Sequence, residues 1–201
     1  MGGLVHLLSS VIETEVTMAV ATRTKYGTVA MSLHWFMAVL LIFMLFFGED
    51  LMKGKGVGGA FGPSLHVSIG STILILSVFR LIWRLSNPPP AYPASMAPWE
   101  RMASTATHLV FYALLIGIPL TGWLATPKFL SEEGMKAGLT LFGAFPLPAA
   151  PNLGLPMKGI HELGSNLGIA LLALHVLAAL KHHFVNRDDV LRRMLPFGRT
   201  G

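Results

Sequence analysis

The stretch HELGSNLGIALLALHVLAALKH, residues 161–182, carries histidines at positions 161, 175 and 182 within an apolar background. Intervals of seven and fourteen residues return to nearly the same face of an α-helix, so His161 and His175 point the same way, about 21 Å apart along the axis. Ionisable side chains inside a membrane helix are costly and usually mark function, and imidazole is a good ligand of haem iron. The alternative is a pair of histidines hydrogen-bonded within a bundle.

The composition indicates a small integral membrane protein. Of 201 residues, 53% are hydrophobic and 12% are charged, and the mean hydropathy is +0.61. The chain has no cysteine, which excludes iron–sulfur clusters, thiolate-ligated haem and covalently attached haem c. The formal net charge is +5, but the basic residues lie beside apolar segments, which indicates membrane topology and no nucleic-acid partner.

Four apolar stretches are long enough to cross a bilayer, at residues 28–48, 65–85, 103–125 and 160–180. The segments between them are rich in glycine and proline, which break helices, so they are expected to be loops. The sequence therefore predicts an all-α, integral membrane four-helix bundle. We divide the chain into an N-terminal extension at residues 1–25, for which disorder is one option, a four-span domain at residues 26–196, and a tail at residues 197–201.

The distribution of lysine and arginine predicts the orientation. Basic residues gather before span one, around the second loop and after span four, so both termini are expected in the cytoplasm. The two opposite loops carry no arginine, and acidic residues there balance the lysines. Those lysines are Lys53, Lys55, Lys128, Lys136 and Lys158.

With this topology, four histidines fall at two depths. His66 and His161 lie at the outer starts of spans two and four, whereas His34 and His175 lie near the inner ends of spans one and four. Each pair can supply two axial nitrogens to one haem b. The sequence thus predicts two b haems, held by an outer pair (His66 and His161) and an inner pair (His34 and His175), inside the bundle.

Further residues share these faces. Gly168 lies midway between His161 and His175, and Gly70 follows His66 by one turn, so both could leave room for a porphyrin edge. Close helix packing is an equal alternative for each glycine. Arg80 lies fourteen residues after His66, at the depth of the inner pair, where a guanidinium could hold a haem propionate or could anchor the helix at the inner surface.

Three other histidines carry weaker signals. His108 lies near the inner end of span three without a partner at matching depth, so we interpret it as a hydrogen-bonded bundle residue. His182 continues the face of His161 and His175 to the inner surface, and His183 is turned away from that face by about 100°.

At these residues the chain resembles the bacterial cytochrome b561 family of four-helix di-haem membrane proteins. The resemblance extends from about Tyr26 to Pro196 and rests on several short stretches. They are Lys25-Tyr26-Gly27, Ser32-Leu33-His34-Trp35, His66-Val67-Ser68-Ile69-Gly70, Arg80-Leu81-Ile82-Trp83-Arg84-Leu85, His161-Glu162-Leu163, Asn166-Leu167-Gly168, His175, His182-His183, Leu191-Arg192-Arg193-Met194 and Pro196.

The resemblance implies a bacterial inner-membrane protein that passes electrons through two b haems to the ubiquinone pool. We expect ubiquinone near His182, with His183 as the less well directed alternative, because an imidazole can hydrogen-bond a quinone carbonyl and transfer a proton to it. The family also suggests superoxide as a small anionic donor at the periplasmic face, towards the outer lysines. Two alternatives are a haem-bearing membrane anchor subunit of a larger redox enzyme and a proton-coupled transporter.

Overall fold

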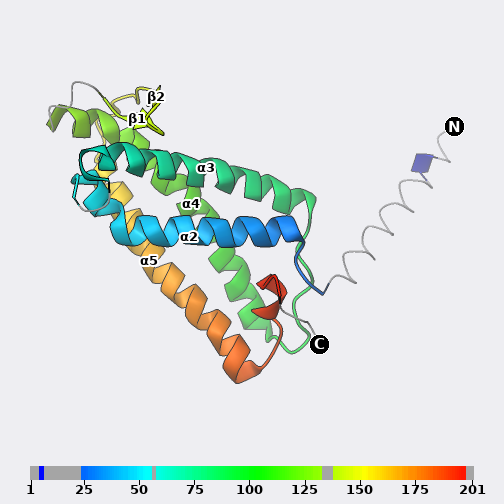
Figure 1. Cartoon of the computed structure of the whole chain (residues 1–201). Helices are drawn as coiled ribbons and strands as arrows, with labels where there is room; N and C mark the ends of the chain where they lie inside the picture. Colours follow the sequence, from blue (N-terminus) through cyan, green and yellow to red (C-terminus); the bar gives the residue numbers. More distant parts are fainter. Residues whose placement is uncertain (1–4, 7–23, 56–57, 133–137, 198–201) are drawn as a thin grey trace.

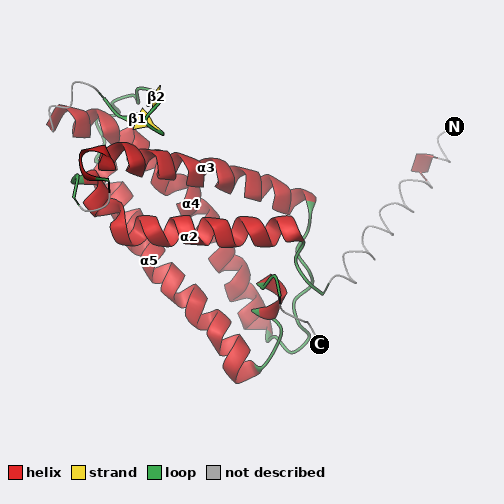
Figure 2. Cartoon of the chain, in the orientation of Figure 1, coloured by secondary structure: helices red, strands yellow, loops and turns green. Residues whose placement is uncertain are grey.

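The computed structural model describes residues 5–6, 24–55, 58–132 and 138–197, and most of them are helical (Figures 1 and 2). The all-α, four-span prediction is confirmed, because four helices each contain a membrane-length window of mean hydropathy 1.8 to 2.3. They are α2 (Thr28–Met52), α3 (Gly62–Ser86), α4 (Pro98–Glu132) and α5 (Met157–Lys181). Most of the N-terminal extension at residues 1–25, and residues 198–201 of the tail, lie outside the described ranges.

The helices pack in chain order. Helix α2 lies along α3, α3 along α4, and α4 along α5, whereas α2 and α5 touch at few positions. We call the end where α2 begins and α5 ends the terminal end, and the opposite end, where the loop between α4 and α5 lies, the loop end. Figure 1 shows α5 diverging from α2 towards the terminal end.

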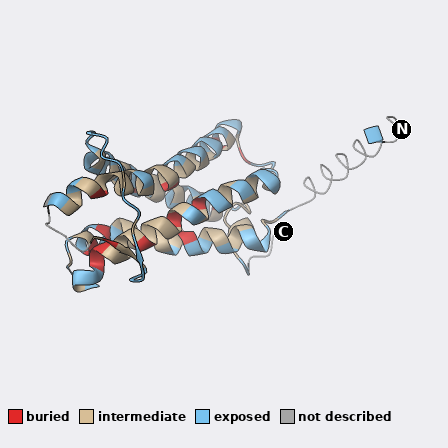
Figure 3. Cartoon of the chain, turned by 90° about the horizontal axis from the view of Figure 1, so that it is seen from above, coloured by how far each residue is buried: buried red, intermediate tan, exposed pale blue. Residues whose placement is uncertain are grey.

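Large apolar residues are exposed along all four helices, as expected for a surface that faces lipid. Figure 3 shows that few helical residues are buried and that most are intermediate or exposed. The small protein core lies halfway along the helices, where Met37, Ile73 and Leu115 are buried. Partly buried apolar residues pack around these three side chains, namely Leu40, Leu41, Met44, Ile69, Leu76 and Phe111. This layer separates the histidines of the terminal end from those of the loop end.

The helices extend beyond the predicted apolar stretches, and α4 does so most. It begins at Pro98, where a missing N–H costs nothing, and it contains both Pro119 and Pro127. Helix α5 continues into the π-helical turn η2 (His182–Asn186), and Arg187 then adopts a left-handed conformation with φ 55°. Hydropathy alone did not mark these ends, because polar residues can extend a helix outside the hydrocarbon core.

A two-stranded hairpin at the loop end was not predicted. Strand β1 (Thr140–Leu141) pairs antiparallel with β2 (Phe145–Pro146), and Phe142 and Gly143 between them have positive φ. The hairpin is fastened to α3: the Thr140 amide donates to Ser64 Oγ at 3.1 Å, and the Phe142 amide donates to Ser68 Oγ at 2.7 Å. Near α3, the 3₁₀ turn η1 (Gly59–Phe61) completes this end.

The C-terminal segment covers the terminal end. It contains the 3₁₀ turn η3 (Arg192–Met194) and returns to the start of α2. There the Trp35 indole N–H donates to the Met194 carbonyl at 2.8 Å, and the Tyr26 amide donates to the Arg193 carbonyl at 3.3 Å. The start of α2 and the segment after α5 are thus tied together at the terminal end.

Candidate functional site

The rings of His66 and His161 lie side by side at the loop end, with centroids 6.0 Å apart and planes tilted by 58°. His66 Nδ1 lies 2.9 Å from the Gly48 carbonyl, and His161 Nδ1 lies 2.8 Å from the Ile118 carbonyl. A carbonyl can only accept, so each Nδ1 donates its hydrogen and each Nε2 keeps its lone pair. Histidines that bind metals usually donate their other ring N–H in this way.

Two glycines that were not predicted as site residues leave room for these rings. A Cβ at Gly122 would lie 2.9 Å from His161 Cε1, and a Cβ at Gly48 would lie 3.3 Å from His66 Cε1. The signal that could have found them is the fourteen-residue interval, because Gly48 follows His34 and Gly122 follows His108 by that distance. Each glycine therefore lies on a histidine-bearing helix face, at the level of the loop-end pair.

The rings of His34 and His175 form a second pair at the terminal end, with centroids 6.2 Å apart. Here Arg80 Nη2 donates to His34 Nδ1 at 3.2 Å. That bond uses the lone pair of Nδ1, so the hydrogen is on Nε2. Binding of iron through Nε2 requires the other tautomer, and Arg80 would therefore have to turn away from the ring.

The ring separations suit a haem iron. An iron bonded to two imidazole nitrogens at about 2.0 Å each sets the two ring centroids about 6 Å apart. The loop-end pair has both this separation and the required tautomer. The terminal-end pair has the separation, and it acquires the tautomer once Arg80 is displaced.

His108 lies closer to the terminal-end pair than the sequence suggested. Its ring centroid is 6.1 Å from that of His175, so the expectation that it lacks a partner at matching depth is wrong. The reason is that α4 is long and packs along α5, which brings this face of α4 beside His175. His175 therefore has two imidazole neighbours, His34 and His108.

The two predicted glycines do not contact the histidine pairs. A Cβ at Gly70 would meet no heavy atom within 4 Å, and one at Gly168 would meet Leu45 and Ile118 at ordinary contact distances of 3.6 and 3.7 Å. Packing of the protein atoms therefore requires neither glycine. Arg80 and Arg84 line a cavity of about 30 Å³ at the terminal end, together with Tyr26 and Tyr112.

His182 is buried at the terminal end, with its side chain 7% exposed. Its Nδ1 lies 2.6 Å from Asp188 Oδ2, and Asn186 Nδ2 lies 3.1 Å from the same nitrogen. The sequence analysis did not single out Asp188. His183 instead packs its ring against Phe184 with centroids 4.7 Å apart.

Of the outer lysines, Lys53 forms an ion pair with Glu49, whose hydrogen bond raises the pKa of the Lys53 ammonium group. Its charge is therefore retained but balanced locally. Lys55 and Lys158 are exposed, and Lys136 lies outside the described residues.

The chain is thus a four-helix membrane protein with imidazoles paired at two levels. The family described as prokaryotic cytochrome b561 matches residues 25–197, nearly the whole chain, and the chain belongs to that family. It is 32% identical to cytochrome b561 homolog 2 of Escherichia coli (strain K12), in a match that covers 87% of this chain and 93% of that protein.

Two further relatives match over similar lengths. The probable superoxide oxidase CybB of Yersinia pestis is 29% identical, over 86% of this chain and 96% of that protein. Cytochrome b562 of Cereibacter sphaeroides is 26% identical, over 85% of this chain and 94% of that protein. These relationships identify a haem protein of membrane electron transport that crosses the bilayer several times.

Proposed function

We propose that the protein carries electrons across the bacterial inner membrane through two b haems, one held by His66 and His161 and the other by His34 and His175. The observation that supports this most strongly is the presence of two closely spaced imidazole pairs, with ring centroids 6.0 and 6.2 Å apart. A bound haem supplies reversible one-electron chemistry between its ferric and ferrous states.

The chain contributes ligand orientation and a dry interior. The carbonyls of Gly48 and Ile118 hold the rings of His66 and His161 with Nε2 available to iron. Arg80, displaced from His34, is placed to hold a haem propionate, because a guanidinium pairs well with a carboxylate. The layer of Met37, Ile73 and Leu115 excludes water between the two levels.

We further propose a direction for the electrons, from superoxide at the periplasmic loop end to ubiquinone at the cytoplasmic terminal end near His182. The similarity to a probable superoxide oxidase supports the donor. The basic residues around the termini support the orientation. His182 supports the quinone position, because it is an imidazole one heptad beyond His175 with one nitrogen already oriented by Asp188.

The first experiment is a reduced-minus-oxidised visible spectrum and a pyridine haemochrome assay of the purified protein. We expect b-type bands and two haems per chain, whereas a colourless protein would overturn the proposal. Stopped-flow reduction by superoxide, followed by reoxidation with a soluble ubiquinone, then tests the direction. Co-purification of a large soluble redox subunit would instead support a membrane anchor.

The position of the quinone has its own test. Replacement of His182 by alanine should slow reoxidation by ubiquinone at least tenfold, a typical loss for a removed proton donor. The spectrum and haem content should be unchanged, because His182 is seven residues from the nearest proposed ligand. Reoxidation at the wild-type rate would move the quinone away from His182, and His183→Ala would then be examined.

A further inference from the structure

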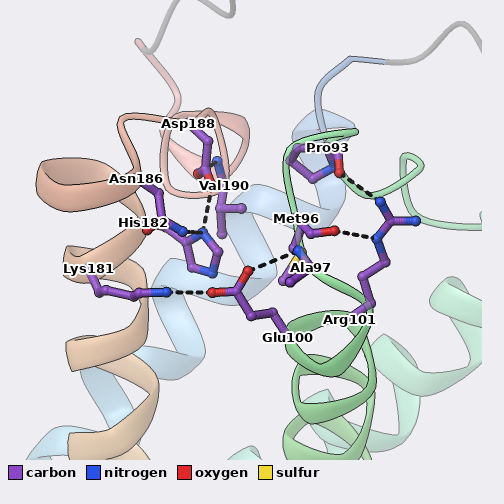
Figure 4. A network of polar contacts seen from close by, with 10 residues as sticks. All are labelled: Pro93, Met96, Ala97, Glu100, Arg101, Lys181, His182, Asn186, Asp188 and Val190. Carbon is purple, nitrogen blue, oxygen red and sulfur yellow. Dashed lines mark hydrogen bonds and ion pairs between the residues drawn. The ribbon is translucent and has the colours of Figure 1, made fainter.

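The terminal end holds a network of buried acidic and imidazole groups around His182 (Figure 4). The Asp188 carboxylate, 6% exposed, accepts from His182 Nδ1, and it also accepts from the Val190 amide at 3.0 Å through its other oxygen. The Asp188 amide donates to the His182 carbonyl at 3.1 Å. The π-helical turn places Asp188 back against the ring that precedes it, and such turns often occur at functional sites.

A second carboxylate approaches the same ring from another helix. Glu100 of α4, 9% exposed, forms an ion pair with Lys181 and accepts from the Ala97 amide at 3.0 Å. It lies within electrostatic reach of His182, and Figure 4 shows the His182 ring between Asp188 and Glu100. The Lys181 side chain is 45% exposed, so this side of the network meets water.

Arg101, the other charged residue drawn in Figure 4, points away from the His182 ring. Arg101 donates to the Met96 carbonyl at 2.9 Å and to the Pro93 carbonyl at 3.4 Å, which fastens the second loop. The ring of His182 is therefore surrounded by two carboxylates and the Lys181 ammonium group. Within the described part of the chain, nothing hydrogen-bonds His182 Nε2, which leaves that nitrogen to exchange a proton.

We infer that His182, Asp188 and Glu100 form a proton-delivery site that supplies the two protons consumed when a quinone is reduced at the terminal end. This inference rests on the proposed function. Asp188 keeps the proton on Nδ1 and orients Nε2, and it acts as a positioning residue.

Reduction of the quinone to the quinol takes two equal steps, each of which transfers one electron and one proton. A haem bound at the terminal end would supply one electron to the quinone. The Nε2–H bond of a His182 ring with hydrogens on both nitrogens would then break as an O–H bond forms on a quinone oxygen. The neutral ring then takes a proton from water at the side of Lys181 and Glu100. A second electron and a second proton transfer complete the quinol, and both carboxylates remain ionised.

The test uses full-length haem-loaded protein reduced with dithionite. Reoxidation by a soluble ubiquinone is followed by stopped flow from about pH 5.5 to about pH 9, the range in which imidazole titrates. Ferricyanide serves as an acceptor that takes an electron without a proton. The variants are Asp188→Asn and Glu100→Gln, and the matched control is Asp189→Asn, because Asp189 has the same charge but pairs with Arg192.

For the wild type we expect the quinone rate to fall as the pH rises. In Asp188→Asn the rate of reoxidation by ubiquinone should fall about tenfold, because the His182 ring loses the carboxylate that orients it. Glu100→Gln should lower the rate by less, and Asp189→Asn should have the wild-type rate. Ferricyanide rates should be equal in all four proteins.

Two results would overturn the inference. The first is a wild-type rate of reoxidation by ubiquinone in both Asp188→Asn and Glu100→Gln. The second is an equal loss of the quinone and ferricyanide rates in both variants, which would give the two carboxylates a structural role in place of proton delivery. Glu100→Gln leaves the bond from Asp188 to Val190 intact, so it separates the two carboxylates. A wild-type protein that ferricyanide reoxidises and ubiquinone does not would instead refute the proposed function itself.

Discussion

Gly122 and His161 are in direct contact across two helices, because a Cβ at Gly122 would lie 2.9 Å from Cε1 of the His161 ring. The same ring donates from Nδ1 to the carbonyl of Ile118, one turn earlier on α4, so it has little freedom to move away from Gly122. A single methyl group on α4 is thus enough to change the position of an imidazole on α5.

We predict that Gly122→Ala displaces His161 and removes the loop-end haem, which lowers the haem content from two per chain towards one. Gly117→Ala is the matched control, because a Cβ at Gly117 on the same helix meets no heavy atom within 4 Å. The pyridine haemochrome assay measures both variants. Full haem content in Gly122→Ala would show that the ring can adapt.

The ligand assignment predicts a paired pattern of losses. Alanine at His66 or His161 should remove mainly the loop-end haem, and alanine at His34 or His175 mainly the terminal-end haem, because one remaining axial nitrogen holds iron weakly. Haem content and redox titration of the four variants test this. Two haems with unchanged spectra in all four would refute the assignment.

His108 provides the internal comparison for this pattern, because its ring lies as near to His175 as that of His34 does. We expect His108→Gln to retain both haems. Loss of the terminal-end haem in His108→Gln, together with its retention in His34→Ala, would exchange the roles of these two residues.

The sequence predicted the parts of this site that depend on helix periodicity. His161 and His175 occupy one face because fourteen residues make nearly four turns, and the four spans follow from hydropathy. The same interval places Gly48 and Gly122 on histidine-bearing helix faces, but their contacts with the rings of His66 and His161 depend on how neighbouring helices pack. The contact of Asp188 with His182 was not predictable in this way, because it depends on a π-helical turn and on a residue with positive φ at Arg187.

Arg80 should tune the terminal-end haem. Reduction adds a negative charge that a nearby guanidinium stabilises, so we predict that Arg80→Gln lowers one of two midpoint potentials by roughly 30 to 60 mV, or about 1 kcal/mol. Arg80→Lys keeps the charge and should recover most of the shift. Arg192→Gln is the control, because Arg192 pairs with Asp189 at the surface. An unchanged titration in Arg80→Gln would assign Arg80 to surface anchoring.

The bond between Ser68 and the Phe142 amide should stabilise the hairpin at the loop end. Ser68 is buried, and Ser68→Ala would leave that amide without its acceptor, at a cost of about 1 to 3 kcal/mol. We predict a lower Tm in detergent and faster proteolysis of residues 138–156. Thr72→Val is the control, because Thr72 bonds only the Ser68 carbonyl in its own helix. Equal protease resistance in both variants would contradict this role of Ser68.

The lysines of the loop end should contribute unequally to the reaction with an anionic donor. Lys53 is paired with Glu49, whereas Lys55 and Lys158 are exposed, so the latter two should supply more of the attractive field. We predict that Lys55→Gln and Lys158→Gln each slow haem reduction by superoxide about two- to threefold at low ionic strength, and that Lys53→Gln slows it less. The differences should disappear as salt screens the charges, with a Debye length of about 10 Å at 0.1 M. The test is to measure these rates by stopped flow at rising ionic strength. A wild-type reduction rate that does not change with salt concentration would refute electrostatic steering by these lysines.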